Sequence, residues 1–114
     1  MSDEPFRDAN RRAFARTAIR LPATVVCGDA RIPVQTVDLG LGGMCFVAPR
    51  PIGPGSRCTV TLALPVEHGN REISASLKVV YSSYLAAAQF KIGTVFTALD
   101  DDAAQVLGRY TSAS

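Results

Sequence analysis

The sequence predicts an all-β fold: a six-stranded antiparallel β-barrel with a flexible N-terminal arm and a C-terminal α-helix. Short segments in which every second residue is apolar recur between residues 18 and 97, separated by turns rich in glycine, proline and aspartate. After residue 100 the apolar residues recur every three or four positions, which is the period of a helix. A chain of 114 residues, 47% hydrophobic and 19% charged, suits one globular domain.

Residues 1–17 form the predicted arm, because this stretch is polar and rich in arginine. Its only large apolar side chains are Phe6 and Phe14, so it can bury little surface. The barrel and its closing helix are expected over residues 18–114.

The first half of the barrel is expected to hold three strands. Alternation predicts a strand over residues 18–27, a tight hairpin at Gly28 and Asp29, and a second strand over residues 31–39. Three glycines within residues 40–43 indicate a sharp bend or a close approach to the backbone. A third strand is expected over residues 44–48, before a loop of prolines and glycines.

The second half is expected to add three strands and the helix. The strands are predicted over residues 57–64, over residues 72–81 and within residues 86–97, the last interrupted near Gly93. The fifth strand has the clearest alternation, and its predicted core-facing residues are Ile73, Ala75, Leu77, Val79 and Tyr81. The helix is predicted over about residues 100–111, with an aspartate at its start as the cap. Closure of the strands into a barrel removes exposed edges, and the helix would cover one end.

Composition argues against several classes of protein. The three cysteines, Cys27, Cys45 and Cys58, are odd in number and widely spaced, so we predict small core residues in a reducing compartment rather than a disulfide framework. With one histidine, His68, and no Cys-x-x-Cys pair, no metal site is expected. The N-terminus lacks signal-peptide features and no apolar run approaches a membrane span, so a cytoplasmic location without membrane insertion is predicted.

Catalysis is not indicated. The chain has neither a Gly-x-Ser-x-Gly elbow nor a phosphate-binding Gly-x-x-x-x-Gly-Lys loop, and one histidine makes a hydrolytic triad improbable. The sequence therefore predicts a protein that is not an enzyme.

Positive charge gathers near the N-terminus, although the net charge is only +2. Four arginines (Arg11, Arg12, Arg16 and Arg20) occur with no acidic residue between Asp8 and Asp29. One local basic site is more plausible than a surface for nucleic-acid polymers. Binding of single strands would also call for exposed aromatic residues between the basic ones.

The arginines and the segment from Asp38 to Gly43 together suit a ligand that is anionic and carries guanine. The guanidinium fork donates two parallel hydrogen bonds to phosphate oxygens or to the O6 and N7 atoms of guanine. Aspartate can accept from the N1 and N2 donors on the other edge of the base. Each segment also has an interpretation that involves no ligand. The arginines can belong to a solvated arm, and Asp38 can form an Asx turn between strands.

The order and spacing of these residues resemble the PilZ family. That family is marked by an R-x-x-x-R motif before the first barrel strand, which Arg12 and Arg16 match. Its second motif, [D/N]-x-S-x-x-G, is matched by Asp38 and Gly43, with Gly40 in the usual place of serine. Residues 90–96 look like the family's late strand, so the resemblance spans about residues 11–111.

The resemblance implies a six-stranded barrel that acts as a receptor for the bacterial second messenger cyclic di-GMP, with no cofactor besides that ligand. The residues it assigns to the ligand are Arg11, Arg12, Arg16, Asp38, Gly40 and Gly43. An arginine in the position of Arg11 tends to favour a stacked pair of ligands, so two molecules per protein are expected. Ligand binding is expected to order the arm and change the interaction with a downstream partner protein. The alternative is a PilZ-like adaptor in pilus or flagellar function that binds no nucleotide.

Overall fold

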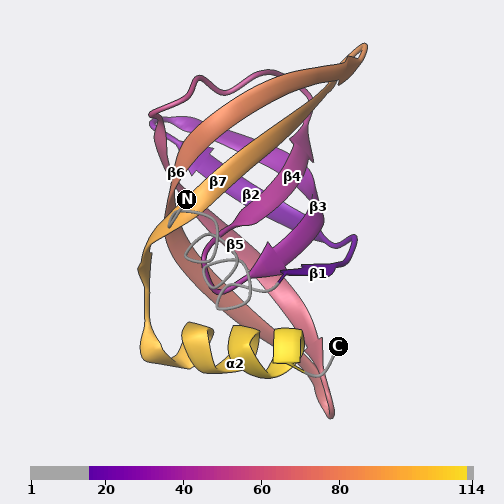
Figure 1. Cartoon of the computed structure of the whole chain (residues 1–114), viewed down its shortest axis with the longest axis vertical. Helices are drawn as coiled ribbons and strands as arrows, with labels where there is room; N and C mark the ends of the chain where they lie inside the picture. The colour runs from indigo at the N-terminus through magenta and orange to yellow at the C-terminus, as the bar shows by residue number, and fades with distance from the viewer. Residues whose placement is uncertain (1–15, 113–114) are drawn as a thin grey trace, which may run out of the picture.

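Seven antiparallel strands and one helix make up residues 16–112, the part of the chain that the computed structural model describes (Figure 1). The strands are β1 (Arg16–Ala18), β2 (Pro22–Cys27), β3 (Ala30–Gly40), β4 (Met44–Ala48), β5 (Arg57–Val66), β6 (Gly69–Ala86) and β7 (Gln89–Leu99). The helix is α2 (Asp101–Ser112). Most of the predicted arm, residues 1–15, lies outside the described residues.

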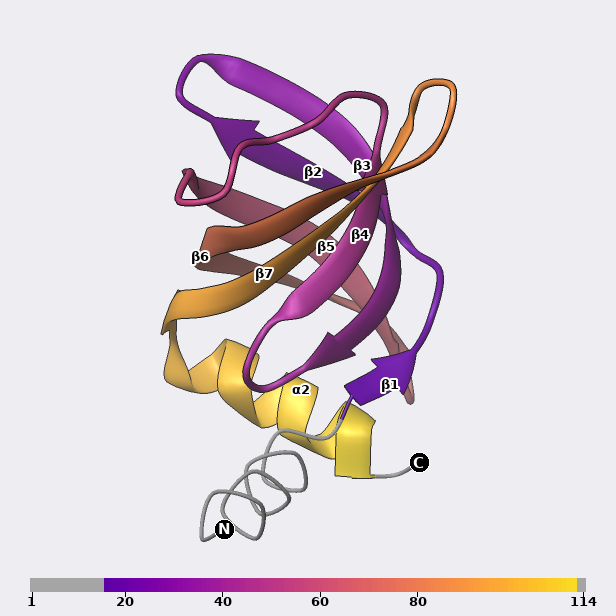
Figure 2. The same cartoon turned by 45° about the horizontal axis from the view of Figure 1, so that its top comes forward.

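The strand pairings close into a barrel-like ring. Neighbouring strands follow the order β3, β2, β5, β6, β7 and β4, and β4 pairs back with β3 (Figure 2). The prediction of six strands and a closing helix is confirmed, and α2 lies across one end of the ring. Within the described residues, no helix has the length and apolar character needed to cross a bilayer.

Strand β1 spans the predicted boundary between arm and barrel at residue 17, and it is an additional strand on the edge of β3. Strand β2 pairs with β3 only as far as Gln35, which leaves the next part of that edge free for β1. The predicted first strand is broken between β1 and β2. Buried Thr36 joins the two parts, since its hydroxyl donates to the Ile19 carbonyl (2.5 Å) and accepts from the Leu21 amide (2.9 Å).

The core forms where the alternation predicts it. Fully buried residues from β2, β3, β4, β5, β6 and β7 meet inside the ring, together with Ala103 and Leu107 of α2. The Asp100 carboxylate accepts the Ala103 amide at 2.7 Å, which confirms the predicted helix cap.

Four register shifts interrupt the strand pairings, and two of them decide how residues of the candidate site are oriented. The register of β3 with β4 shifts between Thr36 and Asp38, and the register of β6 with β7 shifts between Val79 and Tyr81. Each bulge reverses which face the following residues occupy. The prediction that Tyr81 faces the core is therefore wrong: Val79 is 1% exposed, whereas Tyr81 is 44% exposed.

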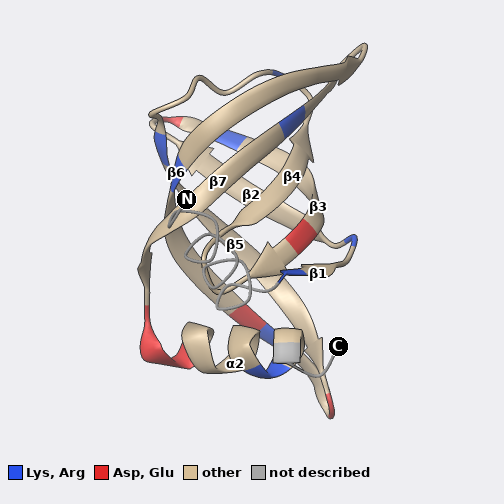
Figure 3. Cartoon of the chain, in the orientation of Figure 1, with Lys and Arg blue, Asp and Glu red and all other residues tan. Residues whose placement is uncertain are grey.

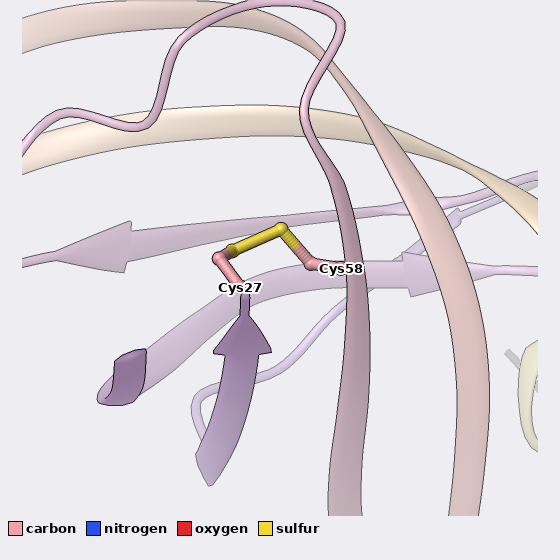
Figure 4. Close-up of a disulfide and its surroundings, with 2 residues drawn as sticks. All are labelled: Cys27 and Cys58. Atoms are coloured by element: carbon pink, nitrogen blue, oxygen red, sulfur yellow. A yellow bond between two sulfur atoms is a disulfide. The ribbon is translucent and has the colours of Figure 1, made fainter. Parts of the chain in front are cut away.

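Cys27 and Cys58 form a disulfide, so the prediction that all three cysteines are free core residues is wrong (Figure 4). The pairing of Val26 with Thr59 places these cysteines at the next position across β2 and β5, with Cα atoms 4.6 Å apart. The register of β2 with β5 brings the two thiols together, and the spacing of the cysteines along the sequence does not reveal this pairing. Cys45 is a buried free thiol.

We expect reduction of the disulfide to lower the free energy of unfolding by about 4 kcal/mol, because the bond closes a loop of 31 residues in the unfolded chain. Urea denaturation with and without dithiothreitol measures this difference. A Cys27→Ser/Cys58→Ser double variant serves as the control and should not respond to reductant. Equal urea midpoints for the wild-type chain under both conditions would contradict the expectation.

Candidate functional site

An ion pair joins the two predicted motifs. The Arg16 guanidinium donates to the Asp38 carboxylate at 3.0 Å, across 22 residues of sequence. Antiparallel pairing of β1 with β3 produces this contact by placing Arg16 opposite Gly40 and Ala18 opposite Asp38. In Figure 3 the acidic segment of β3 accordingly lies beside the basic start of β1.

The pair contributes little to folding. The side chains of Arg16 and Asp38 are 39% and 28% exposed, and an ion pair at this exposure is worth about 0–1 kcal/mol. A ligand that displaces the contact and binds Arg16 or Asp38 would therefore lower the stability of the fold only slightly. This makes the pair better suited to binding than to stability.

A row of residues continues from Asp38 around the outside of the ring. Asp38 pairs with Cys45, Cys45 with Gly93, and Gly93 with Tyr81, so the row crosses β3, β4, β7 and β6. Cys45 is buried but does not belong to the core cluster that contains its neighbours Met44 and Phe46. The row thus forms an outer face.

Tyr81 covers this outer face. Its ring lies directly over Gly93, where an added Cβ would overlap the ring atoms. Its hydroxyl shares a hydrogen bond with the Cys45 thiol at 3.6 Å. Cys45 is 1% exposed beside it, whereas Tyr81 itself is 44% exposed.

The surroundings raise the pKa of Tyr81 to about 12, mainly through the hydrogen bond with Cys45 and through partial burial. Electrostatic interactions with Cys45 and Asp38 raise the pKa of Tyr81 further, and the positive charge of Arg16 lowers it. Tyr81 lies on the row of residues that begins at Asp38, so the strand register connects it with the face that carries the ion pair.

The raised pKa of Tyr81 predicts a loss of stability in alkaline solution. The ordinary tyrosine pKa is 10.0, so the unfolded chain releases this proton first. The stabilisation from neutral Tyr81 is complete below pH 10 and is lost as the pH rises to about 12. Urea denaturation across this window measures the loss. A Tyr81→Phe variant should lose less stability, and an equal loss in both proteins would contradict the assignment.

The glycine segment between β3 and β4 packs tightly. The Gly40 amide donates to the Gly43 carbonyl at 3.0 Å, and the Phe96 amide donates to the Gly42 carbonyl at 2.9 Å. A Cβ at Gly43 would overlap the Thr94 carbonyl oxygen and lie 2.9 Å from the Val95 Cα. Glycine at position 43 is thus required by the backbone of β7, a reason independent of any ligand.

Of the predicted site residues, the structure brings Arg16, Asp38 and Gly40 together, and Gly43 lies at the back of the same bend. Arg11 and Arg12 lie outside the described residues. Tyr81 is the residue that sequence reasoning placed on the wrong face. The one sequence feature that relates to the position of Tyr81 is the interruption predicted near Gly93, because the Tyr81 ring lies over this glycine.

Two surface hollows lie elsewhere. One of about 720 Å³ lies between the β5–β6 turn and α2, lined among others by Val66, Arg71 and Tyr110. The other, of about 460 Å³, is lined by residues around Cys58 and Leu77. Neither contains a motif residue. A flat base can lie against the outer face of a sheet without a deep pocket. The positions of these hollows therefore do not determine where a nucleotide would bind. Among residues 16–112, no cluster of side chains could hold a metal ion.

Comparisons with known proteins agree with this fold. The family model described as "PilZ domain" matches residues 10–113. The inhibitor of motility MotI/DgrA of Bacillus subtilis superposes with a TM-score of 0.79 at 19% identity, covering 90% of this chain and 50% of that chain. This chain therefore spans half the length of that protein. No curated protein matches the chain by sequence.

Two further structures were solved with a nucleotide. The PilZ domain of YcgR from Escherichia coli, with c-di-GMP, has a TM-score of 0.67 at 15% identity and covers 90% of each chain. The PlzA protein of Borreliella burgdorferi, in complex with c-di-GMP, has a TM-score of 0.61 at 16% identity, over 95% of this chain and 44% of that one. At these identities the likeness shows the fold.

Proposed function

The chain belongs to the PilZ family, and on that premise we propose that it is a receptor for cyclic di-GMP and not an enzyme. The observation that carries the proposal is the Arg16–Asp38 contact, which joins one residue from each family motif on an outer face of the barrel. Two relatives with the same fold were solved with this nucleotide. The proposed site lies at β1, the start of the β3–β4 bend and Tyr81.

Each residue has a chemical role in the proposal. Arg16 leaves Asp38 to donate to a phosphate or to the O6 and N7 atoms of guanine, and Asp38 accepts from the N1 and N2 donors of a base. Arg11 and Arg12 supply further positive charge from the preceding residues. Arg11 favours a second, stacked ligand molecule, so we propose two ligands per protein.

Tyr81 extends the site beyond the family motifs. A ring that is 44% exposed and electrostatically linked to Asp38 and Arg16 offers an apolar surface for a purine. Stacking of a base on an aromatic ring contributes about 1–3 kcal/mol. Support of the ring by Gly93 from below limits its freedom, which reduces the entropy lost on binding.

Gly40 weakens the proposed binding without removing it. A serine hydroxyl at this position would add one hydrogen bond, worth about 0.5–1.5 kcal/mol. Its loss corresponds to roughly tenfold in affinity or less, at about 1.4 kcal/mol per decade.

The proposed signal is a change in the residues before β1. The ligand's phosphates recruit Arg11 and Arg12 to the barrel, and the face formed in this way is recognised by a downstream protein. Hydrogen exchange of residues 1–15 should slow when cyclic di-GMP is added. Unchanged exchange in a protein saturated with ligand would remove this part of the proposal.

Amide chemical shifts test the location of the site. Adding cyclic di-GMP to the ¹⁵N-labelled chain should shift the signals of residues 16–18, residues 38–43 and Tyr81. The β5–β6 turn at Glu67 and His68 is the internal control, because it lies beside α2 and away from the motifs. Shifts confined to that turn would place the ligand elsewhere.

A second candidate function, an adaptor that binds no nucleotide, is favoured by one observation, Gly40 in place of the motif serine. An adaptor would give no shifts with cyclic di-GMP and would hold a protein partner stably in its absence. The Arg16–Asp38 pair, which retains one residue of each family motif, favours the receptor.

A further inference from the structure

Strand β6 extends beyond the barrel wall and leaves one edge open. Its pairing with β5 ends at Lys78, and Val79 makes two further bonds, to Gly55 and Ser56. From residue 80 to residue 86, β7 pairs with one edge of β6, and no described residue hydrogen-bonds to the other edge. Figure 1 shows this β6–β7 hairpin projecting from the end of the ring opposite α2.

The projecting hairpin is apolar and uncharged. No charged residue and no proline occurs between Lys78 and Lys91. Val80, Tyr84 and Leu85 are 53%, 68% and 52% exposed. The tip is accordingly tan in Figure 3, where Lys and Arg are blue and Asp and Glu are red.

Natural proteins usually protect such an edge with charge or proline, because unpaired backbone groups bind other strands. Here only the bulges at Val80 and near Leu85 interrupt it, leaving Tyr81 to Tyr84 in regular pairing with β7. An exposed edge that carries large apolar side chains and no charge indicates a surface that is covered in the working protein.

We propose that a second copy of this chain covers it, through antiparallel pairing of the two β6 edges about a twofold axis. An edge strand offers both donors and acceptors, so the same segment from another copy satisfies it. Self-pairing brings residues 80–86 of one chain opposite the same residues of the other. Because the segment carries no charge, no like charges oppose each other.

The absence of charge on the hairpin also argues against one class of partner. A strongly acidic or basic partner segment would find no opposite charge between Lys78 and Lys91. Tyr84, which already packs edge-on against Phe90 with ring centroids 5.6 Å apart, presents its outer surface to the partner.

The dimer is expected to be weak. One short strand pair with a few apolar side chains buries less than the roughly 800 Å² per partner of a standard interface. We therefore expect dissociation in the micromolar range. The association does not depend on the proposed nucleotide function, so its test uses the chain without ligand.

Sedimentation equilibrium of the full chain, at concentrations from about 5 to 500 µM, is the test. The wild-type chain should shift from the mass of one chain to the mass of two. A Val80→Lys/Leu85→Lys variant should dissociate at least tenfold more readily, since like charges then meet across the axis. Val66→Lys is the matched control, because Val66 is an exposed apolar residue (41%) at the far β5–β6 turn, and it should dimerise as the wild type does.

Three results would overturn the proposal: a wild-type chain that stays monomeric throughout, association that the double variant leaves unchanged, or growth into open polymers. If the wild-type chain stays monomeric, the β6 edge remains available to a strand from another protein. Hydrogen exchange supplies a readout that needs no variant, because the amides of residues 80–86 should gain protection as the wild-type concentration rises. Constant exchange across the dimerisation range would equally exclude this edge.

Discussion

Replacing Arg16 with alanine should weaken the binding of cyclic di-GMP by about a hundredfold while leaving the fold intact. Two hydrogen bonds from a charged fork to the ligand are together worth about 3 kcal/mol, and each 1.4 kcal/mol is a factor of ten. The fold should barely respond, because the Arg16–Asp38 pair is exposed and worth at most about 1 kcal/mol. Calorimetry measures the affinity, and urea denaturation measures the stability.

Arg20→Ala is the matched control for this variant. Arg20 carries the same charge four residues later, is exposed, and forms no ion pair with a residue in the described part of the chain. Its loss should reduce the affinity severalfold at most, through the general positive potential. Equal losses from both variants would show that charge alone matters. Arg16 and Arg20 also have the R-x-x-x-R spacing, so a larger loss from Arg20→Ala would assign the motif to that pair instead of Arg12 and Arg16.

Replacing Gly43 with valine should lower the free energy of unfolding by about 4 kcal/mol or more. The first added atom already meets the Thr94 carbonyl and the Val95 Cα, which are backbone atoms of β7 and cannot move aside as a side chain could. Strands β4 and β7 would have to separate near the place where Thr94 also hydrogen-bonds to the Met44 carbonyl (2.8 Å). Overpacking of this kind lies at the severe end of single substitutions.

Gly53→Val is the control for Gly43→Val. Gly53 lies in the exposed loop before β5, and a Cβ there meets only the Ser56 hydroxyl, at 3.9 Å. Its stability should change by less than about 1 kcal/mol. Urea midpoints compare the two variants directly, and similar midpoints would contradict a structural role for the glycine at position 43.

The ring of strands could be predicted from the sequence because buried and exposed residues alternate so regularly. In β5, for example, Val60, Leu62 and Leu64 are buried and their neighbours are not. The helix followed from its period and its aspartate cap for the same reason. Alternation and helical period are local features of the sequence, and the strands and the helix of the structure follow them.

The orientation of the site could not be predicted, because it depends on bulges. One residue inserted at Val37 turns Asp38 to the outer face, and one at Val80 does the same for Tyr81. A bulge is fixed by how two strands meet, so neither sequence segment alone reveals it. The disulfide escaped prediction for a related reason, since the register of β2 with β5 is what brings Cys27 to Cys58.

The most direct test of the receptor proposal is a calorimetric titration of the full chain with cyclic di-GMP, with GTP as the control nucleotide. The account predicts binding at micromolar concentration or tighter, a stoichiometry near two, and no comparable heat with GTP. No binding of cyclic di-GMP, verified by an independent method on folded protein, would contradict the account and favour the adaptor function.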